Sequence, residues 1–132
     1  MPSRIYASFA LLKLFQKEPG YQKVARLLED DYRDDNPPLL QIINFGEIIY
    51  RTKKDFGDAA KIRVIRSVVQ LGLRIISAPD ALVYEAAELK GSYAISYADA
   101  FLLATALREG TTIVTGDPEF KKVESLCRIE WV

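Results

Sequence analysis

The chain has 132 residues, 49% of them hydrophobic and 27% charged, a composition that fits one folded domain over 1–132 and excludes a disordered chain. Its 18 basic and 18 acidic side chains cancel, so no overall field attracts a polyanion. The absence of histidine excludes histidine acid–base catalysis, histidine metal sites and Ser-His-Asp triads.

Short apolar runs alternate with helix-like segments in the first half of the chain. The elements expected there, in order, are a strand over 4–7, helices over 8–15 and 21–33, a strand over 39–43 and a helix over 44–56. The last of these helices begins at Asn44, a residue type that often caps a helix start.

The second half continues the alternation. The expected elements are a helix over 59–72, a strand over 73–77, helices over 79–91 and 97–109, a strand over 111–115 and a possible fifth strand over 128–132. Asp58 and Ser96 are expected caps, and Gly110 is expected to end the helix that Ser96 begins. Strands that alternate with helices, without hairpin signals, predict a three-layer α/β/α sandwich with a parallel sheet of about five strands.

Three acids stand at the carboxyl ends of expected strands or at the starts of helices. Glu47 lies three residues after Asn44 and Asp99 three after Ser96, which is the spacing of a capping box. Asp117 precedes a proline, as a helix cap often does. Each acid alone therefore has a structural explanation.

The same three acids together predict a metal site, because the carboxyl ends of parallel strands meet at one edge of the sheet. Clustered carboxylates repel one another unless a cation joins them, and oxygen ligands without histidine or cysteine suit Mg²⁺ or Mn²⁺. The implied chemistry is hydrolysis of a phosphodiester by metal-activated water. Thr115 and Ser8 are candidates to orient water or phosphate, and Glu119 is a further acid whose favoured interpretation is an exposed helix-start residue.

Charge is uneven along the chain. Residues 29–35 carry five acids and one arginine, whereas residues 51–66 carry six bases and two acids. The basic segment fits a solvated helix pair or a track for an RNA backbone, and the candidate contacts for RNA are Lys53, Lys54, Lys61 and Arg63.

Three segments, "NFGEII", "SYADAFLLATAL" and "IVTGDPEF", resemble the three carboxyl-terminal motifs of the PIN-domain family, and in particular of the VapC-type ribonuclease toxins. The resemblance implies a metal-dependent endoribonuclease whose metal ligands are Glu47, Asp99 and Asp117. It also implies a homodimer, and an antitoxin partner that inserts into the active-site groove.

The segment "RIYASFALL" resembles the first motif of the same family, in which an aspartate ends the first strand. Ala7 occupies the position of that aspartate, so the resemblance implies an inactive or weakened nuclease. A naturally weakened member and a deliberate replacement both fit, and the intact motif around Ala7 favours replacement.

Other interpretations stay open or are disfavoured. A PIN-like module that lost activity and only binds RNA or protein is the main alternative. A receiver-like phosphoacceptor needs acids after the first strand, where Ala7 and Ser8 stand, and no glycine-rich phosphate loop is present.

The expected cellular setting is the cytoplasm. No apolar run approaches the roughly 20 residues needed to cross a bilayer, and the amino terminus lacks the pattern of a signal peptide. Cys127 is the only cysteine, so an internal disulfide is excluded and the residue is expected to be a buried structural thiol.

Overall fold

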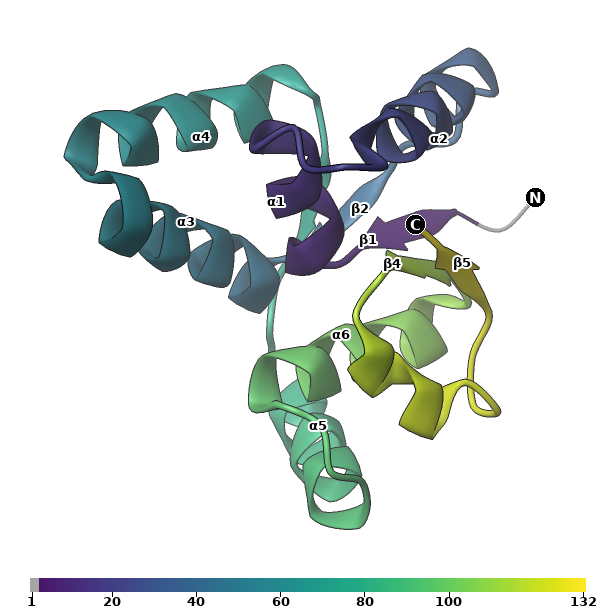
Figure 1. Ribbon diagram of the computed structural model, residues 1–132. Helices are drawn as coiled ribbons and strands as arrows, with labels where there is room; N and C mark the ends of the chain where they lie inside the picture. The colour runs from purple at the N-terminus through teal and green to yellow at the C-terminus, as the bar shows by residue number, and fades with distance from the viewer. Residues whose placement is uncertain (1–2) are drawn as a thin grey trace.

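The computed structural model describes residues 3–132 and shows a parallel sheet between two layers of helices (Figure 1). The strands are β1 Arg4–Tyr6, β2 Leu39–Gln41, β3 Arg74–Ile76, β4 Thr112–Thr115 and β5 Ile129–Trp131, in the sheet order β3-β2-β1-β4-β5. The helices are α1 Ser8–Phe15, α2 Tyr21–Arg33, α3 Ile42–Phe56, α4 Asp58–Gln70, α5 Asp80–Ser92, α6 Tyr97–Glu109 and the 3₁₀ helix η1 Pro118–Val123. The predicted α/β/α class and five-stranded parallel sheet are confirmed.

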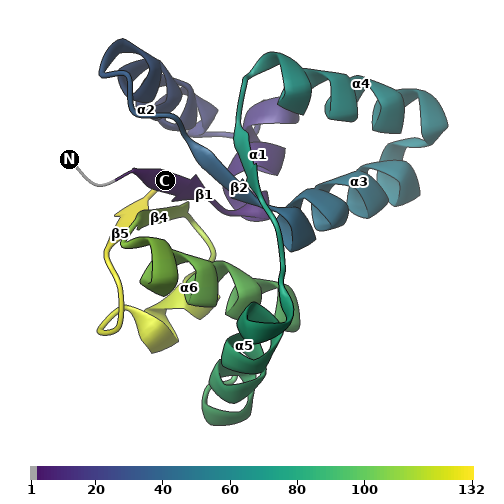
Figure 2. The same ribbon diagram turned by 180° about the vertical axis from the view of Figure 1, so that it is seen from behind.

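Apolar side chains of the strands face both helical layers. Successive strand residues point to opposite faces, so Ile5 and Ile113 belong to one core cluster and Tyr6 and Val114 to the other. Helices α5 and α6 and η1 cover the first face, and α1 to α4 cover the second, as the two opposite views show (Figures 1 and 2). The three central strands β1, β2 and β4 are mostly buried, as expected for strands covered on both faces, whereas the edge strands β3 and β5 are more exposed.

The central strand is β1, which lies between β2 and β4. Ile5 is in register with Leu39 on one side and with Ile113 on the other. The carboxyl ends of these strands therefore lie side by side, and the chain leaves that edge into α1, into α3 and into the turn before η1. This edge is where the candidate site lies.

The start of α3 differs from the prediction. The helix begins at Ile42, and Gln41 caps it because its side-chain oxygen accepts a hydrogen bond from the Ile43 amide at 2.7 Å. Asn44 is buried inside the first turn, and its side-chain nitrogen donates to the Ala98 carbonyl at 3.2 Å. Asn44 therefore joins α3 to α6 instead of capping a helix.

The other helix boundaries agree with the sequence to within a residue or two. Ser96 caps α6 as predicted, and Gly110 ends that helix at a φ of 66°, a value that favours glycine. The predicted capping role of Asp58 is wrong, because Asp58 is the first residue of α4 and Gly57 occupies the cap position. None of the helices within residues 3–132 has both the length and the apolar character that crossing a membrane requires.

One acid of the 29–35 run is buried. Asp31, on α2, accepts hydrogen bonds from the Tyr6 hydroxyl at 2.5 Å and from Arg4 Nη1 at 2.6 Å. These bonds satisfy a carboxylate that is only 2% exposed, and they fasten α2 to β1.

Cys127 is half-buried, so it is less enclosed than predicted. Its Sγ lies 3.7 Å from the Val123 carbonyl, to which the thiol donates a weak hydrogen bond, and burial raises the pKa of the thiol. A raised pKa keeps the thiol protonated and unreactive, which agrees with a structural role.

Candidate metal centre

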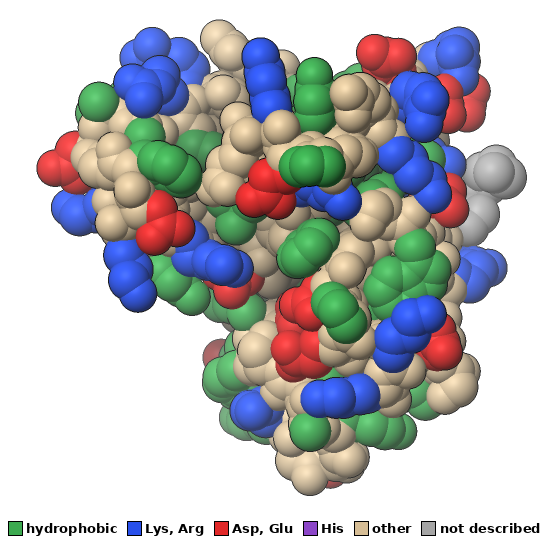
Figure 3. Space-filling view, in the orientation of Figure 1, with side chains coloured by type: hydrophobic (Ala, Val, Ile, Leu, Met, Phe, Trp, Pro, Cys, Tyr) green, Lys and Arg blue, Asp and Glu red, His purple; other side chains and the backbone are tan. Residues whose placement is uncertain are grey.

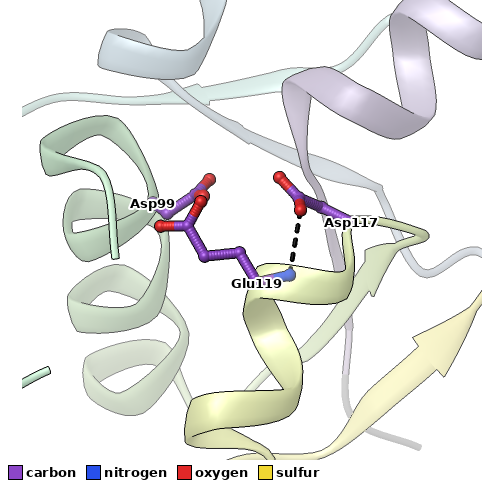
Figure 4. Close-up of side chains that lie close together, drawn as sticks. All are labelled: Asp99, Asp117 and Glu119. Carbon is purple, nitrogen blue, oxygen red and sulfur yellow. Dashed lines mark hydrogen bonds between the residues drawn. The ribbon is translucent and has the colours of Figure 1, made fainter. Parts of the chain in front are cut away.

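Three carboxylates converge at the carboxyl edge of the sheet. Asp99 comes from the first turn of α6, Asp117 from the turn after β4, and Glu119 from η1. Each offers an oxygen that lies within 4.8 Å of an oxygen of the other two (Figure 4). In the space-filling view, acidic side chains gather near the middle of the visible face of the molecule (Figure 3).

Glu119 belongs to this cluster, so its favoured interpretation as an exposed helix-start residue is wrong. The residue is half-buried, and its carboxylate lies beside that of Asp99 (Figure 4). Its position two residues after Asp117 is the only signal in the sequence, and an acid in the first turn of a helix is common for electrostatic reasons alone.

Asp117 is fixed by the turn that carries it. Its Oδ1 accepts a hydrogen bond from the Glu119 amide at 3.0 Å, so the predicted capping role is confirmed for η1. Its own amide donates to Thr115 Oγ1 at 3.1 Å. Through this bond Thr115, which is fully buried, holds the turn in place. Its predicted role in orienting water or phosphate stays a prediction.

Glycine is required at position 116 because the turn passes very close to other parts of the chain. A β-carbon there would lie 2.3 Å from the Val132 carbonyl oxygen and 2.7 Å from Phe9 Cε1. The turn between β4 and Asp117 therefore passes too close to α1 and to Val132 for any side chain at position 116.

We expect Gly116→Ala to lower the free energy of unfolding by about 1–3 kcal/mol, because the added methyl group forces backbone atoms apart. Gly46→Ala is the matched control, since nothing lies within 4 Å of its added methyl group and the position is helical. It should stabilise the protein by about 0.5–1 kcal/mol. Urea unfolding of the two variants measures both effects, and equal stabilities would contradict this view of the turn.

Asp99 has the most perturbed carboxyl group of the site. Its pKa is raised to about 7, first by burial and then by the neighbouring charges of Glu119, Asp117 and Glu47, while a side-chain hydrogen bond with Ser96 lowers it. The Asp99 amide donates to Ser96 Oγ at 3.1 Å, which fixes the residue in the first turn of α6. Acids that repel one another in a buried site favour a bound proton or a bound cation.

This pKa has a consequence for the pH dependence of stability. Because the folded pKa of Asp99 lies near 7 and the unfolded pKa near 3.9, the folded state binds the proton more tightly between these values. The free energy of unfolding of the metal-free protein should therefore fall as the pH rises from about 4 to about 7. Urea unfolding in EDTA at several pH values measures this slope, and Asp99→Asn should flatten it. An equal slope in the variant would contradict the assignment.

Glu47 lies at the same edge of the sheet but outside the group formed by Asp99, Asp117 and Glu119. Its Oε1 accepts a hydrogen bond from the Ser8 hydroxyl, and its Oε2 lies 3.9 Å from Arg51 Nη1. Its charge raises the pKa of Asp99, which places it within electrostatic reach of the cluster. The Ser8 hydroxyl thus orients Glu47, whereas the predicted metal contact of Glu47 and the predicted catalytic role of Ser8 stay predictions.

Ala7 directly follows the central strand β1, at the same edge of the sheet as the three carboxylates. It is 2% exposed, its amide donates to the Val114 carbonyl at 3.0 Å, and it packs in the core cluster that contains Ala100, next to Asp99. It is also the N-cap residue of α1, a position that aspartate favours. An aspartate at this position therefore suits the start of the helix, and its predicted contact with a metal stays a prediction.

The predicted RNA contacts lie on the hairpin of α3 and α4, and two of them are paired. Lys53 Nζ and Lys61 Nζ lie 2.9 Å and 3.4 Å from Asp58 Oδ1. Within residues 3–132, Lys54 and Arg63 have no carboxylate oxygen within 4.0 Å. Arg63 lines a groove of about 430 Å³ between α1 and this hairpin, together with Phe15 and Thr52.

Residues 8–126 match the PIN domain family. The chain belongs to this family. The match spans the segments that carry Asp99, Asp117 and Glu119, so the carboxylate cluster is part of the PIN domain itself. No match was found among curated proteins.

Several solved structures are similar to this PIN domain in fold. VapBC2 from Rickettsia felis, bound to a DNA fragment from its promoter, has a TM-score of 0.80 at 17% identity, with 98% of each chain covered. A toxin–antitoxin complex from Klebsiella pneumoniae has a TM-score of 0.71 at 20% identity and covers 97% of this chain and 96% of its own. VapC20 from Mycobacterium tuberculosis, a Sarcin-Ricin loop cleaving toxin, has a TM-score of 0.74 at 16% identity and covers 92% and 95%.

Proposed function

We propose that this PIN domain is a metal-dependent endoribonuclease of the VapC type, weakened by Ala7. One observation carries the proposal, namely the three carboxylates whose oxygens lie within 4.8 Å at the carboxyl edge of the sheet. Their donor set contains only hard oxygen atoms, which fits Mg²⁺ or Mn²⁺, and a divalent cation offsets the repulsion that raises the pKa of Asp99.

In this proposal Asp99 and Asp117 hold the metal, Glu119 lies directly beside them, and Glu47 adds a further carboxylate nearby. When bound, the ion supplies an activated water molecule and neutralises negative charge on the phosphate. The residues of the chain fix the geometry. Thr115 holds the turn of Asp117, and Ser8 orients Glu47 through its hydroxyl.

RNA is the proposed substrate, and an antitoxin is the proposed protein partner. VapC20, one of the similar structures, cleaves the Sarcin-Ricin loop, and the other two similar structures are toxin–antitoxin assemblies. A homodimer is proposed as well, because a second copy could cover exposed apolar side chains such as Tyr84 on α5 and Leu107 on α6, which are 70% and 47% exposed. The cytoplasm is the proposed setting of this activity.

A PIN domain that binds RNA or protein without cleaving is the second candidate, and Ala7 is the observation that favours it. The two candidates are distinguished by incubating the purified chain with single-stranded and structured RNA, with Mg²⁺ or Mn²⁺ and with EDTA. Slow cleavage that EDTA stops supports a weakened nuclease. Retained RNA binding without cleavage, in both this chain and Ala7→Asp, would support the binding module.

Binding of RNA along the α3 and α4 hairpin should depend mainly on Lys54 and Arg63, because Lys53 and Lys61 are paired with Asp58. Reversing either unpaired charge to glutamate should weaken RNA binding. The slope of the logarithm of the binding constant against the logarithm of the salt concentration should become smaller in magnitude by about 0.7 for each phosphate of single-stranded RNA that the protein no longer neutralises. Arg26→Glu, an exposed change on α2, is the control and should leave the slope unchanged. Binding titrations over a range of salt concentrations measure this, and an unchanged slope in Lys54→Glu and Arg63→Glu would exclude the track.

A further inference from the structure

Helix α6 has only half of a capping box. Ser96 Oγ accepts the Asp99 amide at 3.1 Å, which is the first half. In a full capping box the side chain of the third helical residue accepts the amide of the cap in return. Here that amide, the Ser96 N–H, is instead accepted by Oε1 of Glu119, which is 23 residues away in the chain. The Asp99 carboxylate is therefore not used for capping and faces Asp117 (Figure 4).

Glu119 also contacts the other aspartate of the cluster. Its backbone amide donates to Asp117 Oδ1 at 3.0 Å, while its carboxylate holds the amide at the start of α6. One residue thus links the turn that carries Asp117 to the helix that carries Asp99. The separation of the two aspartates therefore depends on the position of Glu119.

We infer that Glu119 is a positioning residue, which supplies the missing half of the α6 capping box and thereby sets the Asp99 carboxylate against Asp117. Because this role concerns the proposed metal site, it rests on the proposed function. A second bond between the same segments, from Lys122 Nζ to the Ala94 carbonyl at 2.8 Å, offers a matched control. It joins η1 to the approach of α6 without touching the cluster.

Two substitutions separate positioning from a contribution of charge alone. Glutamine keeps an oxygen that can accept the Ser96 amide but has no charge, whereas alanine removes both. The readouts are the exchange rate of the Ser96 amide hydrogen, followed by NMR, and the affinity for Mn²⁺. Ser96 is an exposed residue, so we expect the exchange rate of its amide to report on the bond with Glu119.

In Glu119→Ala we expect exchange of the Ser96 amide to rise by at least about tenfold and Mn²⁺ affinity to fall about 10–100-fold, the range typical of residues that orient metal ligands. Glu119→Gln should retain the protection of Ser96 and recover most of the Mn²⁺ affinity. Lys122→Met should leave both readouts close to those of the parent chain.

Two results would overturn the inference. Equal loss of Mn²⁺ affinity in Glu119→Gln and Glu119→Ala, with Ser96 still protected in the glutamine variant, would mean that the charge of Glu119 acts and its hydrogen bond does not. Unchanged exchange rates of the Ser96 and Asp99 amide hydrogens in Glu119→Ala would mean that Glu119 does not hold the start of α6. If no protein binds Mn²⁺, the proposed metal site fails, and amide exchange alone then decides the positioning role.

Discussion

Replacing Ala7 with aspartate is expected to produce magnesium-dependent cleavage of RNA, at a rate on the order of a hundredfold above that of the parent chain. Position 7 directly follows the central strand and belongs to the same core cluster as Ala100, the neighbour of Asp99, so we expect a carboxylate there to join the existing acids. The added ligand should tighten Mg²⁺ binding and fix the position of the ion relative to the RNA phosphate. Position matters because misplacement of a reacting group by about 1 Å can cost a hundredfold in rate.

The control for this experiment is Ala7→Asn, which has nearly the same shape and can also cap α1 but carries no charge. Cleavage is measured on the same RNA for the parent and both variants, with Mg²⁺ and with EDTA. Only Ala7→Asp should cleave faster than the parent, and only with the metal. Equal rates in Ala7→Asp and Ala7→Asn would show that position 7 is not a ligand position.

Asp117→Asn, made in the Ala7→Asp protein, should remove the restored cleavage and lower Mn²⁺ affinity by at least about tenfold. The fold should survive, because the asparagine oxygen can still accept the Glu119 amide and asparagine is as good a helix cap as aspartate. The expected pattern is therefore a large loss of activity with little change in the free energy of unfolding.

Asp80→Asn is the matched control for this loss. Asp80 is also an acid in the first turn of a helix, but it is exposed at the start of α5 and lies outside the cluster. Initial rates and urea unfolding curves should show that Asp80→Asn keeps the cleavage activity. Full activity in Asp117→Asn would remove Asp117 from the proposed site.

Much of the fold is predictable from local sequence, because each strand is a short apolar run and most helices start or end at residues with a clear preference. Ser96 and Gly110, for example, mark the two ends of α6. The start of α3 is not predictable in this way. Asn44 has the higher preference for a cap position, but burial against Ala98 places it inside the helix, and the less favoured Gln41 becomes the cap.

The candidate site is predictable where a residue stands directly at a strand end, and less so where it depends on contacts across the fold. Asp99 and Asp117 follow from their positions relative to helix starts. The place of Glu119 does not, because its carboxylate bonds to Ser96, a contact between segments that no local pattern encodes. The pairing of Lys53 with Asp58 likewise depends on how α3 meets α4.

The central claim is that the carboxylate cluster of Asp99, Asp117 and Glu119 binds a divalent cation, with Asp99 and Asp117 as ligands, and anomalous diffraction from crystals of Ala7→Asp soaked in Mn²⁺ tests it most directly. The expected result is a manganese peak between the carboxylates of Asp99 and Asp117, absent from crystals soaked with EDTA. A map without a peak at this cluster, at a Mn²⁺ concentration that supports cleavage, or with the ion bound elsewhere, would contradict the proposed metal centre.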